Sequence, residues 1–175
     1  MNGRKLKNQF GWWAMENLQF VKNYKNVEIL RHSFNGLAGE IFGIGFESWY
    51  LSGFCTDKYK PFSFADGKRI VANVSVNELD LIMNGESKRA IQIGTVMTHR
   101  DYRNQGLSQE LINRILTEYK NKHDIMYLFA NHSVLDFYPK FGFHAVEETL
   151  FTINYDHGDR EQGFIRELSG TNQAD

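Results

Sequence analysis

Alternation of apolar and polar residues dominates the middle of the chain. Residues 70–77 and 79–83 are apolar at every second position, and a third run places Ile91, Ile93, Thr95 and Met97 on one face. A period of two residues is typical of β-strands. Between the second and third runs, Asn84-Gly85 is a strong signal for a tight hairpin turn. The three runs therefore predict an antiparallel meander.

Other segments have the 3.6-residue period of helices or carry short apolar runs. The segment from about Gly106 to Asn121 is apolar along one side and predicts a helix. An earlier helix is expected around Phe34, Leu37, Ile41 and Ile44, with Ser33 or Asn35 as its cap. Shorter apolar runs predict strands at 27–30, 125–130, 143–146 and 150–155, and a helix at 132–140 capped by Asn131. A loop is expected at 53–68, and a short helix or an aromatic arm at 12–21.

This order of elements predicts a mixed α/β (α+β) fold. We expect a central, mostly antiparallel, twisted sheet of six to seven strands flanked by helices. The chain of 175 residues suits one domain, at residues 1–155, followed by a polar tail or appendage at 156–175.

Composition narrows the classes of function. The net charge of −1 gives no bulk attraction to nucleic acid or to an anionic membrane, and no stretch approaches the roughly 20 apolar residues of a membrane span. Cys55 is the single cysteine, so no internal disulfide can form, and a reducing, cytoplasmic setting is expected. No residues have the spacing of metal ligands.

The segment R-x-x-G-x-S, at residues 103–108, joins a strand end to a helix start. The first turn of a helix carries backbone N–H groups without internal partners, and their dipoles favour an anion. Gly106 lets a bulky diphosphate approach the backbone, and Arg103 adds a planar cation. An ordinary connection with a solvated arginine is the alternative.

This loop and the later segment F-Y-P-K-F-G-F, at residues 137–143, together resemble the GNAT superfamily of N-acetyltransferases. The family pattern is Arg/Gln-x-x-Gly-x-Gly/Ala, followed by an aromatic-rich F-Y-x-K-x-G-F. The resemblance covers about Val71 to Tyr155. Ser108 replaces the commoner glycine or alanine, and Arg100 stands where a proline is frequent.

The resemblance implies a GNAT-like fold, acetyl-coenzyme A (acetyl-CoA) as co-substrate, and a set of site residues. Six consecutive residues would wrap the pyrophosphate of the coenzyme: Arg103, Asn104, Gln105, Gly106, Leu107 and Ser108. The strand backbone that would pair with the pantetheine arm is that of Val96, Met97 and Thr98. The remaining implied contacts are the Asn131 amide on the arm, Tyr138 near the thioester sulfur, and Phe137 and Lys140 on the cofactor.

Transfer of an acetyl group requires a neutral amine. A lysine-like amine has a reference pKa of about 10.4 and is mostly protonated at neutral pH, so a base must remove its proton. A backbone N–H near Met97 or Thr98 can stabilise the oxyanion, and the phenol of Tyr138 is the expected acid for the leaving thiolate. Candidates for the base are Glu40, Glu47, Glu78, Asp80, His99 and His132, none of them favoured. His99 is expected to be exposed, and Cys55 to pack rather than react.

The acceptor is expected to be a small-molecule amine or a peptide amine, bound near residues 34–64. The aromatic residues there, which either form an acceptor wall or fill the core, are Trp49, Tyr50, Phe54, Tyr59, Phe62 and Phe64. Near the N-terminus, we expect the aromatic residues Trp12, Trp13 and Phe20 to form a lid over the site or a homodimer contact. Two alternatives to an enzyme stay open at this point: a non-catalytic acyl-CoA-binding regulatory module, and an α/β interaction domain in which both motifs are accidental.

Overall fold

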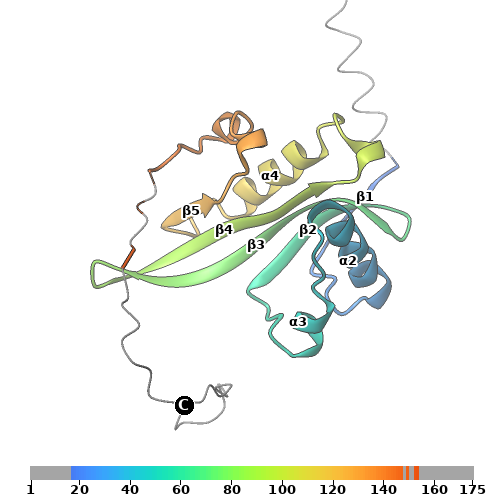
Figure 1. Ribbon diagram of the computed structural model, residues 1–175, viewed down its shortest axis with the longest axis horizontal. Helices are drawn as coiled ribbons and strands as arrows, with labels where there is room; N and C mark the ends of the chain where they lie inside the picture. Colours follow the sequence, from blue (N-terminus) through green and yellow to red (C-terminus); the bar gives the residue numbers. More distant parts are fainter. Residues whose placement is uncertain (1–16, 148, 150–151, 154–175) are drawn as a thin grey trace, which may run out of the picture. The chain divides into compact units, whose positions relative to one another are not determined.

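The computed structural model describes residues 17–147, 149 and 152–153. The chain divides into two units, Met1–His144 and Ala145–Asp175, and every described helix and strand belongs to the first. Within that unit, five strands form one sheet in the order β1-β2-β3-β4-β5, with helices against it (Figure 1). Their bounds are β1 (Gln19–Lys22), β2 (Tyr59–Asp66), β3 (Arg69–Met83), β4 (Glu86–Thr98) and β5 (Ile125–Leu128).

The first four strands pair antiparallel, and β5 runs parallel to β4. The predicted mixed α/β fold with a mostly antiparallel sheet is thus confirmed, although the described residues hold five strands rather than six to seven. The predicted turn between β3 and β4 is also confirmed. Asn84 and Gly85 have φ angles of 52° and 81°, the pair of positive values that a tight hairpin requires.

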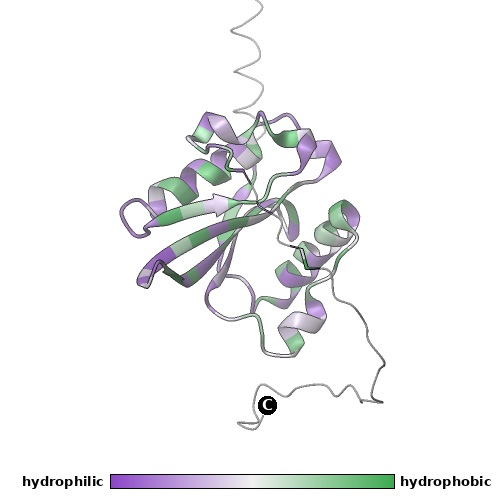
Figure 2. Ribbon diagram, turned by 60° about the vertical axis from the view of Figure 1, so that its left-hand side comes forward, coloured by the Kyte–Doolittle hydropathy of each residue, from purple (hydrophilic) through white to green (hydrophobic). Residues whose placement is uncertain are grey.

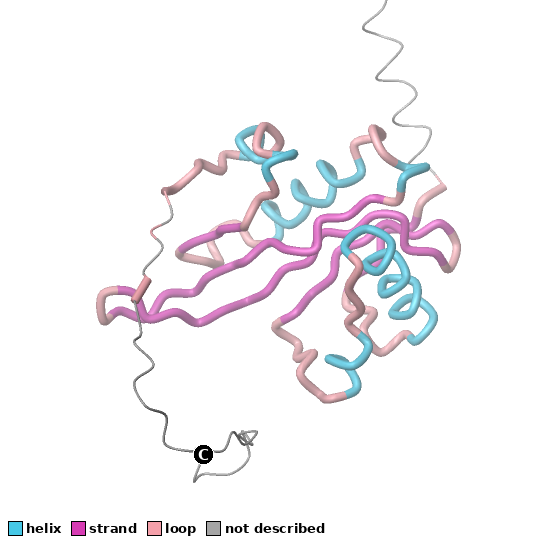
Figure 3. Tube along the Cα trace, viewed as in Figure 1, coloured by secondary structure: helices cyan, strands magenta, loops and turns pink. Residues whose placement is uncertain are grey.

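Two predictions about the strands were wrong. The runs at 70–77 and 79–83 are one continuous strand, β3, of 15 residues, which Figure 3 shows as an unbroken length beside β4. The expected loop at 53–68 contains β2. Five consecutive residues of β2, from Pro61 to Ala65, are buried, so both faces of this strand are covered. Only Phe62, Ser63 and Phe64 alternate between apolar and polar, and three residues are too few to indicate a strand.

A β-bulge interrupts β4. Asn73 of β3 pairs with Met97, but Ser75 pairs with Gly94, so two residues of β4 lie opposite Val74 alone. The first of the two, Thr95, has a φ of 49°. A bulge of one residue reverses the faces, and Met97 therefore packs on the side of the sheet opposite to Ile93. The prediction that Ile91, Ile93, Thr95 and Met97 share one face was therefore wrong.

Helices cover both faces of the sheet (Figure 1). Helix α4 (Leu107–Glu118) confirms the predicted helix and buries Leu107, Leu111, Ile112 and Ile115 against β2, β3 and β4. On the other face lie α2 (Glu28–Phe42), which buries Phe34, Leu37 and Ala38, and the short α3 (Glu47–Leu51). In Figure 2, hydrophobic and hydrophilic residues follow one another along both longer helices.

Several short predicted elements differ from the structure. The apolar run at 27–30 is the start of α2 rather than a strand, because four residues are too few to distinguish the two periods. The predicted helix at 132–140 is two 3₁₀ turns, His132–Val134 and Tyr138–Phe141. Residues 143–146 form no strand.

Predictions at the two ends of the chain are tested only in part. Most of the expected strand at 150–155, and the whole of 156–175, lie outside the described residues. Trp12 and Trp13 lie outside them as well. Phe20 belongs to β1 and packs against Phe62 and Phe64 of the neighbouring strand, so it contributes to this chain's own core.

Candidate functional site

The start of α4 presents unpaired backbone donors. Gly106 is the N-cap residue, with a φ of 79°, and no side chain caps the helix. Its carbonyl accepts from the N–H of Glu110 at 3.0 Å, which begins the helical pattern. Among the described residues, the N–H groups of Leu107, Ser108 and Gln109 have no acceptor. This turn therefore has the free donors that an anion site requires.

Side chains of the preceding loop bond to the loop itself rather than to the helix start. The Nε of Arg103 donates to the carbonyl of Thr98 at 3.2 Å, and the amide of Gln105 donates to the carbonyl of Asp101 at 3.2 Å. Asn104 adopts a positive φ of 62°. These bonds shape the turn while leaving the terminal nitrogens of Arg103 exposed beside it.

His99 anchors the loop to the sheet. Its backbone N–H donates to the carbonyl of Val71 at 2.8 Å, and its side chain is buried. The imidazole lies 2.6 Å from a guanidinium nitrogen of Arg69 and 3.6 Å from a carboxylate oxygen of Glu40. The expectation of an exposed His99 was wrong, because the residue occupies the junction between α2, β3 and the loop.

Strand β4 has an open edge directly before this loop. Strand β5 pairs with β4 only from Ala90 to Ile93, whereas β4 continues to Thr98. Among the described residues, therefore, no strand lies beside the backbone of residues 94–98 on that side. Val96, Met97 and Thr98, expected to pair with the pantetheine arm, lie in this stretch. The side chain of Met97 is itself buried, so only its backbone can serve a ligand.

Tyr138 lies at the start of the second 3₁₀ turn and belongs to the same core cluster as Leu107 of α4. Its ring packs edge-on against Phe137, with centroids 5.2 Å apart. Burial raises the pKa of Tyr138, so the phenol stays protonated at neutral pH. Its hydroxyl has no hydrogen-bond partner within the part of the chain that the structure describes.

Asn131 and Lys140 flank this region. Asn131 is the N-cap of the first 3₁₀ turn, as predicted, and its side-chain oxygen accepts from the N–H of Ser133 at 3.1 Å. The cap uses the oxygen and leaves the NH₂ group available to a ligand. Lys140 is exposed and has no ion pair with any described residue. Either side chain can therefore contact a bound molecule without first breaking a bond.

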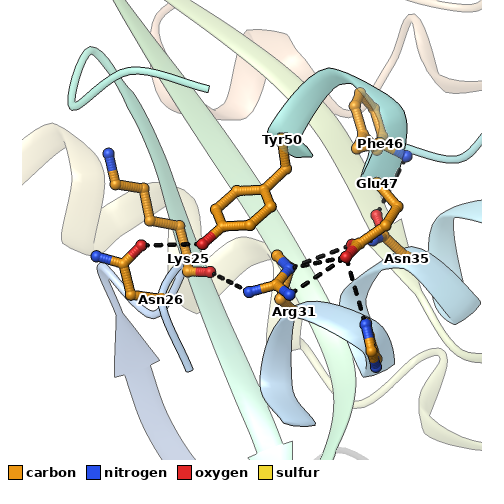
Figure 4. A network of polar contacts seen from close by, with 8 residues as sticks. Lys25, Asn26, Arg31, Asn35, Phe46, Glu47 and Tyr50 are labelled. Carbon is orange, nitrogen blue, oxygen red and sulfur yellow. Dashed lines mark hydrogen bonds and ion pairs between the residues drawn. The ribbon is translucent and has the colours of Figure 1, made fainter. Parts of the chain in front are cut away.

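The carboxylate of Glu47 is engaged in a network with charged and polar neighbours (Figure 4). It accepts from the Nε of Arg31 at 3.2 Å and from the amide of Asn35 at 2.7 Å, and His32 lies 3.4 Å away. The bond from Arg31 lowers the pKa of Glu47. A carboxylate stabilised in this way is a poor base.

Glu78 and Asp80 are paired in the same manner. Burial tends to raise the pKa of Glu78, but hydrogen bonds from Lys60 and Tyr119 outweigh it and lower the pKa. The bond from Lys58 lowers the pKa of Asp80. Among the described residues, no three His, Cys, Asp or Glu side chains form a group that could hold a metal ion.

An aromatic cavity lies on the α2 side of the sheet, opposite α4. Its volume is about 30 Å³, enough for a small group. The residues that line it are Tyr24, Lys25, Arg31, Phe34, Asn35, Phe46, Trp49, Tyr50, Cys55, Tyr59 and Pro61. At its rim, the guanidinium of Arg31 lies 3.9 Å from the ring centroid of Tyr50. Burial raises the pKa of the Cys55 thiol, which favours its protonated form at neutral pH.

The six aromatic residues expected around the acceptor separate into three groups. Trp49, Tyr50 and Tyr59 line the cavity. Phe62 and Phe64 face α4 on the other side of the sheet and fill the core there. The remaining ring, Phe54, is 67% exposed.

The structure also brings forward two residues that the sequence pattern did not single out. Thr95 forms the bulge at the point where β4 and β5 separate, and Asn73 holds its carbonyl. The alternation of β3 placed Asn73 on a polar face, which suggests solvent. That face is instead covered by α2, and Asn73 is fully buried. The burial of this amide is the one feature that marks Asn73 as important, and it can be seen only in the folded chain.

Comparison with known proteins gives consistent results. The sequence model of an acetyltransferase (GNAT) domain matches residues 55–146. A Trypanosoma brucei acetyltransferase is 21% identical, covers 78% of this chain and 99% of its own, and has a TM-score of 0.63. Glucosamine-6-phosphate N-acetyltransferase from Arabidopsis thaliana is 16% identical over 79% of this chain and 99% of its own, with a TM-score of 0.61.

A third solved structure, a predicted acetyltransferase from Clostridium acetobutylicum with acetyl-CoA, is 16% identical, covers 78% of this chain and 96% of its own, and has a TM-score of 0.61. The TM-scores of these three structures show that the chain shares their fold. By sequence, no curated protein matches the chain. Within the described residues, no helix has the length and apolar character needed to span a membrane.

Proposed function

Because the chain belongs to the GNAT family of acetyltransferases, we propose that it transfers the acetyl group of acetyl-CoA to a primary amine of a small molecule or a peptide. The observation that carries this proposal is the start of α4. Three backbone N–H groups there have no acceptor among the described residues, and Gly106 removes any side chain from their approach. The arrangement suits a diphosphate.

The donor half of the site is proposed to extend from this turn along β4. The pyrophosphate would lie against residues 103–108, where Arg103 supplies positive charge. The pantetheine arm would lie along the open edge of β4 at Val96, Met97 and Thr98 and bond their backbone groups as an added strand does. The free NH₂ group of Asn131 would bond the arm from the side of β5.

The chemistry follows from this placement. The neutral amine nitrogen attacks the thioester carbonyl carbon, and a C–N bond forms while the carbonyl oxygen becomes an oxyanion. A backbone N–H near Met97 or Thr98 would stabilise that oxyanion. The C–S bond then breaks, and the phenol of Tyr138 would donate its proton to the leaving thiolate. The amine loses its own proton to water or a base.

The amine acceptor is proposed to bind on the α2 side, where Trp49 and Tyr59 line the aromatic cavity. An amine carried on a small apolar body suits such rings, and a cation can lie over their faces. The indole and phenol rings meet edge-on at 5.2 Å, which gives the cavity a firm wall. The choice of acceptor would then depend on the shape of this wall.

A second function, binding of an acyl-CoA without turnover, is favoured by one observation. Glu47, Glu78 and Asp80 are each paired with a cation that lowers the carboxyl pKa, so none of them is a ready base. A regulatory module with this fold would need the donor site alone.

Two measurements separate these functions. Calorimetric titration with acetyl-CoA should give saturable binding, and its absence would exclude both. A thiol-release screen over polyamines, amino acids, aminoglycosides and peptide N-termini should then find an acceptor for the enzyme. Binding without release on any of these amines would favour the regulatory module.

A further inference from the structure

The amide of Asn73 lies at the centre of a buried polar network on the α2 side of the sheet. Its nitrogen donates to the carbonyl of Thr95 at 2.8 Å and to the hydroxyl of Ser75 at 2.9 Å. Its oxygen accepts from the hydroxyl of Ser63 at 2.7 Å. Both amide hydrogens and the amide oxygen are thus used inside the protein, where an unpaired group would be costly.

Two tyrosines complete the network. The hydroxyl of Tyr24 lies 2.7 Å from that of Ser63 and donates to it, since Ser63 donates onward to Asn73. At the other end, the hydroxyl of Tyr59 lies 2.8 Å from that of Ser75 and 3.4 Å from that of Thr95. Thr95 is therefore approached twice, at its carbonyl by Asn73 and at its hydroxyl by Tyr59.

Thr95 needs this support because its backbone is strained. A positive φ brings the Cβ of a β-branched residue close to the backbone, and threonine rarely adopts it. Such conformations persist only where the surroundings hold them. No glycine or asparagine, which tolerate a positive φ, stands at this position. The strand keeps a strained residue and buries an amide against its carbonyl.

The strained residue lies where the two parallel strands part. Pairing of β4 with β5 ends at Ile93, and the bulge begins two residues later at Thr95. The next residues along the strand are Val96 and Met97, whose backbone the proposed function assigns to the cofactor arm. The conformation of Thr95 therefore sets the direction in which the edge of β4 continues, still paired with β3, beyond the end of β5.

We propose that Asn73 is a positioning residue, which holds the bulge at Thr95 and thereby places the backbone of Val96 and Met97 for the pantetheine arm of the cofactor. This inference rests on the proposed function. Asn73 itself lies in the core and touches no substrate. Its effect is transmitted through one hydrogen bond to the carbonyl of Thr95.

The test compares two ligands that share the nucleotide but differ in the arm. Acetyl-CoA would reach both the helix start and β4, whereas adenosine 3′-phosphate 5′-diphosphate would reach the helix start alone. In Asn73→Ala, calorimetry should show an acetyl-CoA affinity lower by about tenfold or more, and a nucleotide affinity within about twofold of the original. A general loss of structure would weaken both ligands alike.

Tyr24→Phe is the matched control. It removes a buried hydroxyl from the far end of the same network and leaves the bond between Asn73 and Thr95 in place. Both ligands should then bind with unchanged affinity, even where the melting temperature falls. A preferential loss of acetyl-CoA binding in this variant as well would contradict the role of Asn73.

A glycine at the bulge provides an independent test. Thr95→Gly can keep the positive φ without support, so adding Asn73→Ala to it should cost acetyl-CoA affinity only about twofold or less. This is well below the roughly tenfold loss in the original background, because the two residues act through one hydrogen bond and their effects are not additive. Should Asn73→Ala not fold, Asn73→Ser serves in its place and should show the same preference between ligands. Equal effects of the Asn73 substitution in both backgrounds would overturn the inference. A starting protein that binds neither ligand would overturn the proposed function as well.

Discussion

The hydroxyl of Thr98 lies 2.8 Å from the hydroxyl of Ser108. This bond joins the last residue of β4 to the first turn of α4, across the loop that leads from one to the other. Two hydroxyl groups carry two hydrogens, and the bond uses one. The other remains available to donate to a ligand at the helix start, beside the free backbone N–H groups.

Substitution of either hydroxyl should weaken cofactor binding. Ser108→Ala or Thr98→Val removes the shared bond and misplaces the remaining donor, so the affinity for acetyl-CoA should fall by about tenfold. The double variant should be little worse than either single one, because the two hydroxyls act as a unit. Calorimetric titration of the three variants measures this; strictly additive losses would show that the hydroxyls act separately.

Gly106→Val should abolish acetyl-CoA binding while leaving the sheet in place. A β-branched residue is strained at a φ of 79°, and its side chain would project where the diphosphate approaches. Gly85→Val is the matched control, since Gly85 has a φ of 81° in the turn between β3 and β4. Both variants should unfold at lower temperature, but only the first should lose the ligand. Unchanged affinity in Gly106→Val would refute the assignment of the loop.

Tyr138→Phe should slow turnover more than it weakens binding. Loss of a general acid reduces kcat by on the order of 10²-fold or more, while the ring that packs on Phe137 is retained. Tyr119→Phe is the control, because its hydroxyl bonds to Glu78 instead. Thiol release and calorimetry together separate the two effects. Equal kcat in Tyr138→Phe and the original protein would remove the acid role.

Acid should destabilise the protein through Glu47. The bond from Arg31 lowers its pKa in the folded state, so its contribution to stability is present above the unfolded value of about 4.3 and is lost as the pH falls through the lower, folded value. Glu47→Gln should therefore melt at a lower temperature at neutral pH and lose less between about pH 5 and pH 3. Thermal melts across this range measure it. Parallel curves for the two proteins would contradict the pairing.

Much of the fold could be predicted because its signals are local. The hairpin turn depends on Asn84-Gly85, and α4 on a dozen residues of clear period. Strand β2 could not be found, since both of its faces are buried and only Phe62, Ser63 and Phe64 alternate between apolar and polar. The apolar residues at 27–30 were assigned to the wrong class because a run of four fits a strand and a helix turn equally well.

The candidate site likewise has one part that the sequence reveals and another that depends on the fold. The loop at 103–108 is contiguous, so its anion-binding character is visible in the sequence. The contact between Asn73 and Thr95 joins residues 22 positions apart and depends on the register of two strands. Only the folded chain shows that the polar side of β3 is covered by α2. The pKa of a candidate base likewise depends on a partner far away in sequence, as with Glu78 and Tyr119.

The placement of α4 and the aromatic cavity on opposite faces of the sheet has a kinetic consequence. A donor held at Gly106 and an acceptor held at Trp49 would not compete for space, so both can be present before any bond breaks. Initial rates against one substrate at several fixed levels of the other should give intersecting double-reciprocal lines. Parallel lines would instead require a covalent acetyl-enzyme.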